Sequence, residues 1–295
     1  MTPAVCVIII TWNGLEDTVA CLETVYDQTY DNLHVIVVDN GSDDGTFEQV
    51  AEKFPETELI QLPENIGAVR GYNVGFRRAL ESDYPYLFLL NNDTLLAPDC
   101  IAELVKEAES APDVGLVMPK IYYADEPKLI WSVGTRANPL NLEIVQLGYN
   151  EVDEGQWREP TDIDDAPFCA VLMKRTMMDD VGLPDEIFYF YYEDMDYCLR
   201  ARRRGYRLRL APAATMWHKV SSSSGGSDTP RERYWMARSG VLYFRKHAHF
   251  WQWPIILFWR TGSATRTTMR LLRKRRMDSL KAYWRGLWHG IREKL

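Results

Sequence analysis

The chain has 295 residues, of which 46% are hydrophobic and 26% are charged, with a formal net charge of -8 at pH 7. This composition excludes a disordered protein, and the length suffices for one large core or for one core plus an appendage. The charge is uneven, because residues 260–295 carry eleven Lys and Arg against Asp278 and Glu293, a net of +9, which leaves -17 for the preceding part. The acidic body disfavours nucleic acid as a partner.

The cysteines are odd in number, widely spaced and without a CxxC pair, so the sequence predicts neither a disulfide framework nor a zinc site. They are Cys6, Cys21, Cys100, Cys169 and Cys198. A reducing, cytosolic compartment is therefore expected. The first residues hold no basic segment and their apolar run ends at Trp12, which favours a buried strand over a signal peptide. No stretch reaches the roughly 18 uninterrupted apolar residues of a membrane span.

The first 118 residues alternate short apolar runs with segments of helical period. Runs rich in Val, Ile and Leu predict strands at residues 5–10, 33–39, 58–62, 86–90 and 114–118. The segments between them predict helices at residues 15–28, 45–54, 67–82 and 98–111. Continuous apolar strands separated by helices indicate an α/β fold with a mostly parallel, Rossmann-like sheet and helices on both faces.

Polar residues follow three of these strands. Thr11 follows the first, Asp39 ends the second, and residues 91–93, Asn-Asn-Asp, follow the fourth. Ligands of such sheets bind beyond the carboxyl ends of the strands, which makes these residues the candidate site. Their oxygens are hard ligands, suited to a Mg²⁺ or Mn²⁺ ion that carries a diphosphate. His218 is a candidate imidazole ligand of the same ion; the alternatives are ordinary turns and a structural histidine.

The second half of the chain is less regular. Residues 119–166 lose clear periodicity and hold several Pro, Gly, Asn and aromatic residues, which predicts an irregular or β-rich insertion that shapes a pocket. Residues 170–181 predict a helix. The later features, in chain order, are a basic run at 199–205, strand-like runs at 206–212 and 215–218, and a flexible Ser- and Gly-rich connector at 221–230.

Three acids crowd into residues 191–200, which read YYEDMDYCLR. Glu193, Asp194 and Asp196 repel one another, and their aromatic neighbours reduce their hydration. Such a cluster costs stability unless a metal, a basic partner or a reaction uses the carboxylates. The alternative is a solvated acidic helix start, because acids favour a helix N-terminus.

The C-terminal tail combines aromatic, aliphatic and basic residues. Residues 250–259, FWQWPIILFW, are too few to span a bilayer but rich in Trp, which favours the membrane interface. Further apolar residues recur at helical spacing, with basic residues on the other faces. The apolar set is Leu280, Trp284, Leu287 and Ile291, and the basic set is Lys281, Arg285 and Arg292. The pattern predicts an interfacial amphipathic helix on an anionic membrane surface; the alternatives are a helix docked on the protein's own core and a dimer contact.

Several motifs stand in a fixed order along the chain. They are ITWN (10–13), VDNGSDDGT (38–46), ENIGAVRGYNVGFRRAL (64–80), LLNNDT (89–94), FYFYYEDMDYCLR (188–200) and His218. Together they resemble the family 2 inverting glycosyltransferases of GT-A fold, and the LNNDT form is most similar to bacterial-type rhamnosyltransferases and other polysaccharide-assembly enzymes. The match covers roughly residues 4–250, and an ordered set of motifs is far more specific than any one of them.

The resemblance implies a GT-A catalytic domain at residues 1–230, with a donor-binding half at about 1–118 and an acceptor-binding half at about 119–230. Residues 231–295 would form a helical, basic extension that associates with the membrane. The implied reaction moves a sugar, such as L-rhamnose, from a dTDP- or UDP-sugar to a hydroxyl of a lipid-linked or polysaccharide acceptor. It would use Mg²⁺ or Mn²⁺, at the cytoplasmic face of the membrane.

The same resemblance assigns residues to the donor. Thr11 and Asp39 match positions that hold the base and ribose region of the nucleotide. Asn91, Asn92 and Asp93 match the metal-binding DXD motif, with Asn in the first position, so Asp93 is the one charged ligand of the triplet. Asn91 would bind the metal through its side-chain carbonyl oxygen or would not bind it at all. Asn92 is assigned to substrate binding.

Further assignments concern the rest of the pocket. His218 matches a histidine that completes the metal site in some members, and Arg70 and Asn73 lie in the stretch that usually lines the donor pocket. Asp194 matches the base that accepts the proton of the acceptor hydroxyl.

The neighbours of that base have several possible roles. Glu193 and Asp196 bind acceptor hydroxyls, fix the loop or pair with Arg200, Arg202 or Arg203. The aromatic residues 188–192 form an apolar wall for a sugar ring, or pack in the core on alternate positions of a strand.

Two other functions are alternatives to glycosyl transfer. A sugar nucleotidyltransferase also uses an α/β fold and Mg²⁺, but it would carry a basic, glycine-rich loop after the first strand, and ITWNGLED has no Lys or Arg. A non-catalytic nucleotide-sugar-binding module of a membrane assembly would not need the complete set of Asp93, Asp194 and His218.

Overall fold

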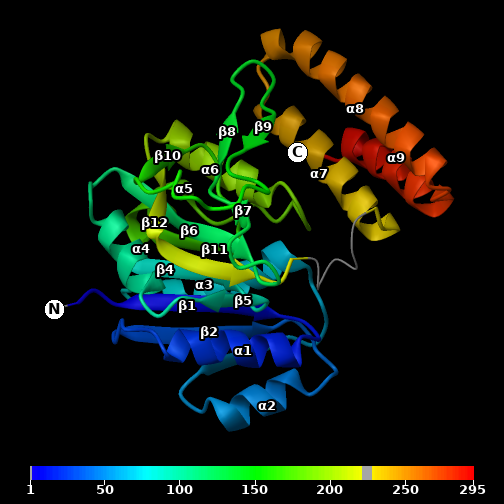
Figure 1. Cartoon of the computed structure of the whole chain (residues 1–295). Coiled ribbons are helices and arrows are strands. Elements are labelled where there is room, and N and C mark those ends of the chain that lie inside the picture. The colour runs from blue at the N-terminus through cyan, green and yellow to red at the C-terminus, as the bar shows by residue number, and fades with distance from the viewer. Residues whose placement is uncertain (1, 221–227) are drawn as a thin grey trace.

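A computed structural model describes residues 2–220 and 228–295 of the chain (Figure 1). Most of the connector predicted at 221–230 lies outside these described residues. The chain forms an α/β body, with three long C-terminal helices standing to one side of it.

A mixed sheet of ten strands forms the centre of the body, with a two-stranded ribbon, β8–β9, beside it. The order along the sheet is β10-β12-β6-β11-β4-β1-β2-β3, while β5 pairs with β12 and β7 with β6. The strands are β1 Val5–Thr11, β2 Leu33–Asp39, β3 Glu58–Gln61, β4 Tyr86–Asn91, β5 Thr94–Leu96, β6 Val114–Tyr123, β7 Ile130–Ser132, β8 Thr135–Ala137, β9 Ile144–Gln146, β10 Thr161–Ile163, β11 Ala170–Lys174 and β12 Arg207–His218.

The predicted mostly parallel sheet is confirmed. β3, β2, β1 and β4 run parallel to one another, and β12 runs parallel to β6. β11 lies antiparallel between β4 and β6 and joins the two parallel groups. The carboxyl ends of β1 and β4 therefore meet at one edge of the sheet.

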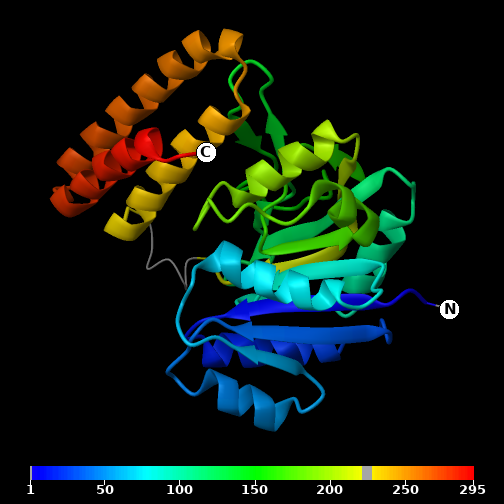
Figure 2. The same cartoon turned by 180° about the vertical axis from the view of Figure 1, so that it is seen from behind.

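Helices cover both faces of the sheet, as the alternating pattern predicts. α1 lies on the near side in Figure 1, and α3 comes to the near side in the reverse view of Figure 2. The helices are α1 Leu15–Tyr26, α2 Thr46–Lys53, α3 Ala68–Leu80, α4 Cys100–Ala108, α5 Arg175–Val181, α6 Glu193–Arg203, α7 Pro230–His247, α8 Trp253–Arg273 and α9 Met277–Arg292, with a 3₁₀ helix η1 at Phe250–Gln252.

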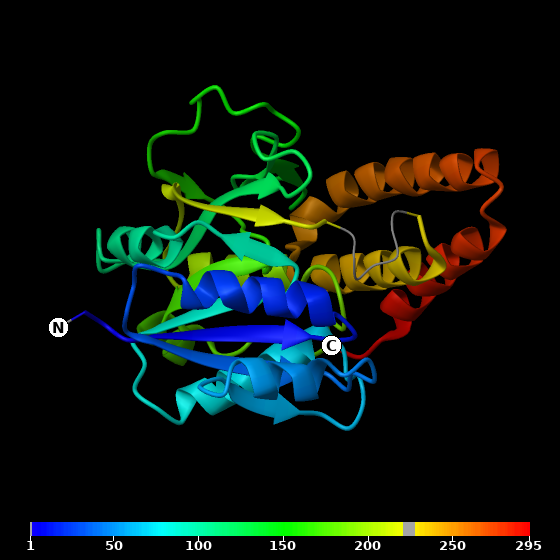
Figure 3. The same ribbon diagram turned by 60° about the horizontal axis from the view of Figure 1, so that its bottom comes forward.

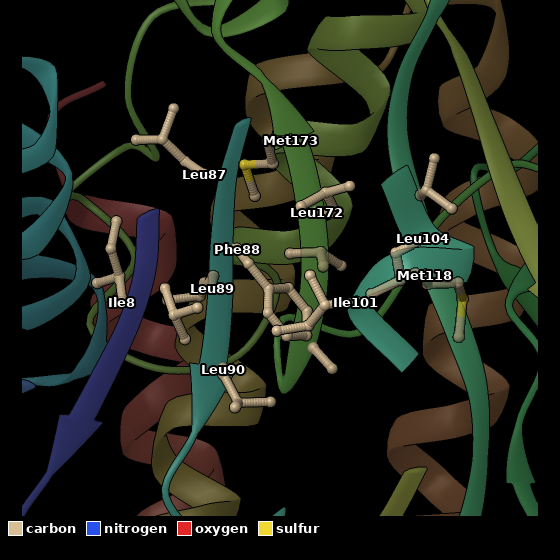
Figure 4. Packing of buried hydrophobic residues seen from close by; sticks show 14 of the residues in the cluster. Ile8, Leu87, Phe88, Leu89, Leu90, Ile101, Leu104, Met118, Leu172 and Met173 are labelled. Carbon is tan, nitrogen blue, oxygen red and sulfur yellow. The ribbon is translucent and has the colours of Figure 1, made fainter. Parts of the chain in front are cut away.

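The core is centred on β4, whose residues 87–90 are completely buried (Figure 4). Ile8 of β1 and Ile101 of α4 belong to the same buried cluster. Full burial of a side chain of this size contributes roughly 1.5–3 kcal/mol. The strands whose ends carry the polar candidate residues are thus held in place by the main hydrophobic core.

All five cysteines are buried thiols that take part in no disulfide. Burial raises the pKa of Cys6 and of Cys21 to about 12. It also raises the pKa values of Cys100, Cys169 and Cys198. Thiols of this kind are packing residues with little thiolate character at neutral pH.

Two segments differ from the sequence prediction. Residues 170–181, predicted as one helix, form strand β11 followed by helix α5. The apolar run AVLM is buried between β4 and β6, and periodicity alone does not distinguish a short buried strand from a helix. Residues 188–192 form an irregular loop and not a strand, so the prediction of alternating strand faces for their aromatic rings is wrong.

The C-terminal helices pack on one another to different degrees (Figure 3). α9 approaches α7 so closely that a Cβ on Gly286 would lie 2.3 Å from the carbonyl oxygen of Tyr234, and one on Gly290 would lie 2.8 Å from that of Arg238. α8 stands farther from α7. The helix predicted in the tail is therefore α9, and its small residues dock on the protein itself.

Apolar side chains join this extension to the body. Phe188 of the body packs in one buried cluster with Leu242 of α7 and Ile256 of α8. α7 begins at Pro230, one residue before the predicted extension; the division into two domains stays a prediction. Within the described residues, no helix combines the length and the hydrophobicity needed to cross a membrane.

Candidate active site

A pocket of about 140 Å³ lies at the edge where β1 and β4 end. It is lined by Ile10, Thr11, Trp12, Asn40, Asn65, Ala68, Tyr72, Asn91, Asn92, Asp93, Tyr189, Phe190, Arg231 and Glu232. The residues come from the first two strand ends, from α3, from the 91–93 turn, from the aromatic loop and from the start of α7. The site predicted at the carboxyl ends of the strands is thus a pocket that the C-terminal extension helps to close.

The 91–93 turn is held by hydrogen bonds to the first strand and helix. Asn92 Nδ2 donates to Thr11 Oγ1 at 3.2 Å and to Thr18 Oγ1 at 3.0 Å. The hydroxyls of Thr11 and Thr18 are also hydrogen-bonded to each other at 2.7 Å. Thr11 and Asn92 therefore fix the turn with their polar atoms, although both also line the pocket.

Asp93, which lines the pocket, forms a buried pair with His218, which does not line it. His218 Nε2 lies 3.1 Å from Asp93 Oδ1, and the two residues are 7% and 5% exposed. β12 brings them together, because His218 at its end pairs in register with Thr94 of β5. The edge of Trp131 packs on the histidine ring, with centroids 4.8 Å apart, and His218 Nδ1 has no hydrogen-bond partner among the described residues.

The donor set fits a divalent cation that is shared with a substrate. In the described part of the chain, no three His, Cys, Asp or Glu side chains converge as a complete metal cage. Mg²⁺ usually binds through one or two carboxylates together with substrate phosphates, so a complete cage is not required. Asp93 supplies a buried carboxylate, His218 an imidazole with an unused ring nitrogen, and Asn91 an amide oxygen that accepts from Tyr72 Oη at 3.4 Å.

Asp39 ends β2, and Asn40, which follows it, lines the pocket. Asp39 is 1% exposed; its Oδ1 accepts from the backbone N of Ser42 at 3.0 Å, and its Oδ2 is buried without a partner among the described residues. Asn40 holds the facing loop, because its Oδ1 accepts from Ile66 N at 3.0 Å. A buried carboxylate oxygen with no partner is costly unless a ligand supplies a donor.

Glu193 and Asp194 begin α6 and are joined by Asp165, a residue from the irregular insertion. Burial raises the pKa of Asp194 to about 6, and burial together with the charge of Asp194 raises that of Glu193 to about 8. Burial and the same charge raise the pKa of Asp165 well above its usual range. At neutral pH Asp194 is thus the ionised member of the cluster, while Glu193 stays largely protonated.

Asp196 does not face the pocket. It is fully buried, and its carboxylate pairs with Arg200 Nε at 2.8 Å, with Lys246 Nζ at 2.7 Å and with His247 Nε2 at 2.7 Å. Burial raises its pKa, but the hydrogen bond from His247 and the charges of Arg200 and Lys246 outweigh burial and hold the pKa at about 2. The structure thus shows Asp196 paired with Arg200, which is one of the roles predicted for it from the sequence.

The backbone before α6 is strained. Tyr191 and Tyr192 both adopt left-handed conformations, with φ of 66° and 69°. Such a conformation costs an L-residue roughly 1–2 kcal/mol. α7 holds the loop in place, because Ser239 Oγ donates to the carbonyl oxygen of Phe190 at 2.9 Å and Tyr192 packs on Tyr243. Strain that surrounding structure maintains is typical of functional sites.

Arg70 and Asn73 lie outside the pocket. Asn73 is buried and donates from Nδ2 to the carbonyl oxygen of Pro184 at 2.9 Å and to Glu186 Oε1 at 3.1 Å. Arg70 is largely exposed, with its Nε 3.7 Å from Glu186 Oε2. In this structure both residues connect α3 to the loop before α6.

Three residues near the site could not be predicted from the sequence. Asp165, which interacts with Asp194 and does not line the pocket, stands in a segment without periodicity. Arg231 and Glu232 line the pocket but belong to the extension, so neither spacing nor a motif identifies them. Asn40 and Trp12 directly follow their strands, so the rule that ligands bind beyond the carboxyl ends of the strands already includes them. Arg231 packs over the ring of Trp12, 5.6 Å from its centroid, and so joins the extension to the first strand end.

Solved structures share this arrangement of elements. The crystal structure of GalNAc-T7 with UDP, GalNAc and Mn²⁺ superposes with a TM-score of 0.60 at 14% identity, covering 81% of this chain and 51% of that one. The mannosyltransferase PcManGT from Pyrobaculum calidifontis, in complex with GDP-Man and Mn²⁺, gives 0.57 at 19% identity, covering 100% and 77%. These likenesses show that the chain has the GT-A fold, as the motifs predicted.

The family follows from the sequence comparisons. The model of glycosyl transferase family 2 matches residues 6–181, more than half of the chain, and the chain therefore belongs to that family of glycosyl-transferring enzymes. It is 24% identical over 298 residues to the dTDP-rhamnosyl transferase RfbF of Shigella flexneri, covering 97% of this chain and 94% of that protein. It is 29% identical over 245 residues to the uncharacterized protein y4gI of Sinorhizobium fredii, covering 79% of this chain but 26% of that longer protein.

Proposed function

We propose that the enzyme is an inverting glycosyltransferase that moves a sugar, with L-rhamnose as the first candidate, from a dTDP- or UDP-sugar to a hydroxyl of a lipid-linked or polysaccharide acceptor. The similarity to a dTDP-rhamnosyl transferase over nearly the whole of both chains supports the choice of sugar. One observation supports the reaction most strongly. Tyr72 is buried, lines the pocket and donates from Oη to Asn91 Oδ1 at 3.4 Å, so it stands beside the 91–93 turn. Burial raises the pKa of Tyr72, and nearby acidic groups that include Glu193, Asp93 and Asp194 add to the increase.

Asp194 is suited to act as the general base. An inverting transfer needs a carboxylate that accepts the proton of the acceptor hydroxyl while that oxygen attacks the anomeric carbon from the face opposite the nucleotide. A base works best when its pKa lies near the operating pH, and burial brings that of Asp194 to about 6. The backbone N of Met195, which donates to Asp194 Oδ1 at 2.8 Å, orients the carboxylate.

The donor would lie along the strand ends. The unpartnered Oδ2 of Asp39 is placed to accept a hydrogen bond from the base or ribose of the nucleotide. Arg231 at the mouth of the pocket supplies a positive charge for the diphosphate. Asp93, His218 and Asn91 would hold Mg²⁺ or Mn²⁺, which when bound neutralises charge on the departing diphosphate. Asn92 and Thr11 keep the turn rigid beneath it.

A panel of nucleotide sugars tests the donor assignment. Thermal unfolding of the full chain is measured with Mn²⁺ and each of dTDP-rhamnose, UDP-glucose, UDP-N-acetylglucosamine and GDP-mannose. A ligand that binds only the folded state raises the midpoint by mass action. dTDP-rhamnose is expected to give the largest shift, and a larger shift by a UDP- or GDP-sugar would overturn the choice of sugar.

The two alternatives predict other products. A sugar nucleotidyltransferase would form a nucleotide sugar from a nucleoside triphosphate and a sugar phosphate, with release of pyrophosphate. A non-catalytic module would bind a donor without consuming it. Release of the nucleoside diphosphate from a bound donor, slow without an acceptor and fast with one, is expected here and from neither alternative.

We also propose that the enzyme acts as a peripheral protein on the cytoplasmic face of a membrane. Residues 260–295 carry a net charge of +9, and Trp284 and Trp288 of α9 remain half exposed after α9 has docked on α7. Basic residues near an anionic leaflet contribute about 1 kcal/mol each, and exposed Trp favours the interface. Binding of the full chain to anionic vesicles that weakens with added salt would support this placement; equal binding to neutral vesicles would contradict it.

Removal of the divalent cation is expected to abolish transfer. Excess EDTA should stop activity, and Mn²⁺ should restore it. Asp93→Ala should weaken binding of both Mn²⁺ and the donor, by more than the roughly 10–100-fold typical of losing a supporting group, because it removes the charged ligand. His218→Ala, which leaves that charge in place, should have the smaller effect. The midpoint of thermal unfolding, titrated with Mn²⁺ and donor, provides the measurement, and full activity in excess EDTA would rule out a metal site.

The pH dependence of the rate should report the ionisation of Asp194. Its raised pKa of about 6 means that the base is ionised above that pH and protonated below it, so kcat/KM should fall about tenfold per pH unit below pH 6. Donor binding, measured by thermal shift over the same range, serves as the control and should change less. A flat rate profile between pH 5 and pH 8 would contradict the assignment.

A further inference from the structure

A long apolar groove runs between α7, α8 and α9, away from the active site, with a volume of about 920 Å³. Ligand pockets generally range from roughly 300 to 1,000 Å³, so this groove has the size of a ligand site. Its walls include Phe244 of α7, Leu257 and Met269 of α8, and Trp284 and Trp288 of α9. None of the five takes part in the donor site.

Apolar contacts hold α8 against its neighbours toward both of its ends. Ile256 packs in the cluster that joins α7 to the body, and Leu271 packs with Ala237 and Tyr283. Between these contacts α8 lines the groove with four small side chains, Thr261, Ala264, Thr265 and Thr268, and with the larger side chains of Leu257, Arg260 and Met269. The glycines of α9 let that helix pack closely on α7, while Trp284 and Trp288 remain half exposed.

The lining is apolar and contains no acid. Its two charged residues are Arg245 and Arg260. Arg260 Nη1 lies 3.4 Å from Glu143 Oε1. Arg245 donates to the carbonyl oxygens of Gly290 and Glu293 at 2.6 and 2.9 Å, and it makes no ion pair with an acidic side chain of the described residues. A ligand with a hydrocarbon chain and an anionic end would match this surface.

Charge selects among possible occupants of the groove. A second copy of the chain would bring another segment of net charge +9 against the first, and the two would repel. An anionic phospholipid supplies the opposite charge for Arg245 and the basic residues around it, together with an apolar chain for the groove. Exposed Phe258 and Trp259 of α8, which do not line the groove, extend the apolar surface toward the same partner.

We propose that the groove between α7, α8 and α9 binds an acyl chain of an anionic phospholipid, so that α8 lies in the membrane interface with one lipid chain held beneath it. The proposal rests on the proposed membrane association of the enzyme and adds to it the site and the ligand. The acyl chain of the lipid displaces water from the wall formed by Phe244, Leu257 and Trp288. The phosphate of the lipid stays among the basic residues at the rim of the groove.

Two matched variants of the full chain test the groove. Thr265→Phe places a ring inside it, whereas Gly262→Phe places the same ring on α8 where a Cβ would meet no atom within 4 Å. Binding is measured with vesicles of phosphatidylglycerol and phosphatidylcholine. If exposed apolar surface alone sets the affinity, both variants should bind more tightly. If a chain enters the groove, Thr265→Phe should weaken binding about tenfold, since excluding about two methylenes at about 0.8 kcal/mol each is enough for that, while Gly262→Phe should not weaken it.

Brominated acyl chains supply an independent readout. Vesicles brominated in mid-chain should quench tryptophan fluorescence of the wild-type protein and of Gly262→Phe, and should quench Thr265→Phe clearly less at saturating lipid. Thermal unfolding and the donor-induced shift of each variant show whether the fold and the donor site are intact.

The outcomes separate the two proposals. Vesicle binding with equal affinity and equal quenching for both variants would overturn the groove site and leave membrane association standing. Absence of binding by the wild-type protein would overturn both. A normal donor-induced shift in either case would leave the glycosyltransferase assignment untouched, because that shift does not depend on lipid.

Discussion

Replacement of Asp194 by Asn is expected to lower kcat by about 10²- to 10⁴-fold, the usual cost of removing a general base. Asn keeps the shape of the side chain and the hydrogen bond from the backbone N of Met195, but it cannot accept a proton from the acceptor hydroxyl. Donor affinity should remain within a few-fold of the wild-type value, because the base acts on the acceptor. Initial rates with saturating donor and acceptor, together with donor titration by thermal shift, measure both quantities.

Glu193→Gln is the matched control for that variant. Burial and the neighbouring charge of Asp194 raise the pKa of Glu193 to about 8, so the residue is largely uncharged at pH 7 and an amide changes little. The rate of this variant should stay within about tenfold of the wild-type rate. Such a loss is smaller than the roughly 10²-fold loss expected as a minimum when a general base is removed. A large loss in Glu193→Gln with a normal rate in Asp194→Asn would exchange the roles of the two residues.

Replacement of Asp196 by Ala is expected to lower the free energy of unfolding by about 3–5 kcal/mol, the range for removing one partner of a buried ion pair. The variant leaves Arg200, Lys246 and His247 around an empty position. Because these partners come from α6 and from the end of α7, the loss should also loosen the loop that carries the strained tyrosines. Chemical denaturation at pH 7 measures the change.

The same experiment has an internal control and a pH test. Asp180→Ala removes an exposed partner of Arg204 and should cost no more than about 1 kcal/mol. The pKa of Asp196 is lowered from 3.8 to about 2, so its stabilising effect is complete above pH 4 and disappears as the pH falls toward 2. The difference between wild type and Asp196→Ala should shrink accordingly. Equal stability at pH 7 would show that the contacts of Asp196 with Arg200, Lys246 and His247 stabilise the fold no more than a solvated surface pair does.

The donor half of the site was predictable because it depends on local order along the chain. A strand that is apolar throughout must be buried, and its carboxyl end must then deliver Asp39 or the 91–93 turn to the edge of the sheet. Asp93 and His218 are more than a hundred residues apart, so only the order of the motifs predicted that they act together. In the structure, the pairing of β12 with β5 brings them together.

The other half depends on partners that no spacing reveals. In the sequence, Asp196 is an acid two residues after the candidate general base Asp194. In the structure, Lys246 and His247, some fifty residues later, pair with it and give it a structural role. Asp165 and Arg231 reach the site from an irregular segment and from the extension. Arg70 and Asn73 stand on the predicted helix α3, but that helix turns them toward Glu186 and Pro184 instead of the pocket.

The reactivity of the five buried thiols can be used to measure conformational opening of the enzyme. Alkylating reagents attack the thiolate, and burial suppresses both the thiolate and access to it, so labelling of the native state must wait for the protein to open. Cys169 directly precedes β11, Cys100 begins α4, and Cys6 lies in β1. Mass spectrometry of time-resolved labelling would therefore rank the opening of three separate regions in the unmodified sequence, and a surface position such as Gly262, changed to Cys, would accept a probe selectively while the native thiols remain silent.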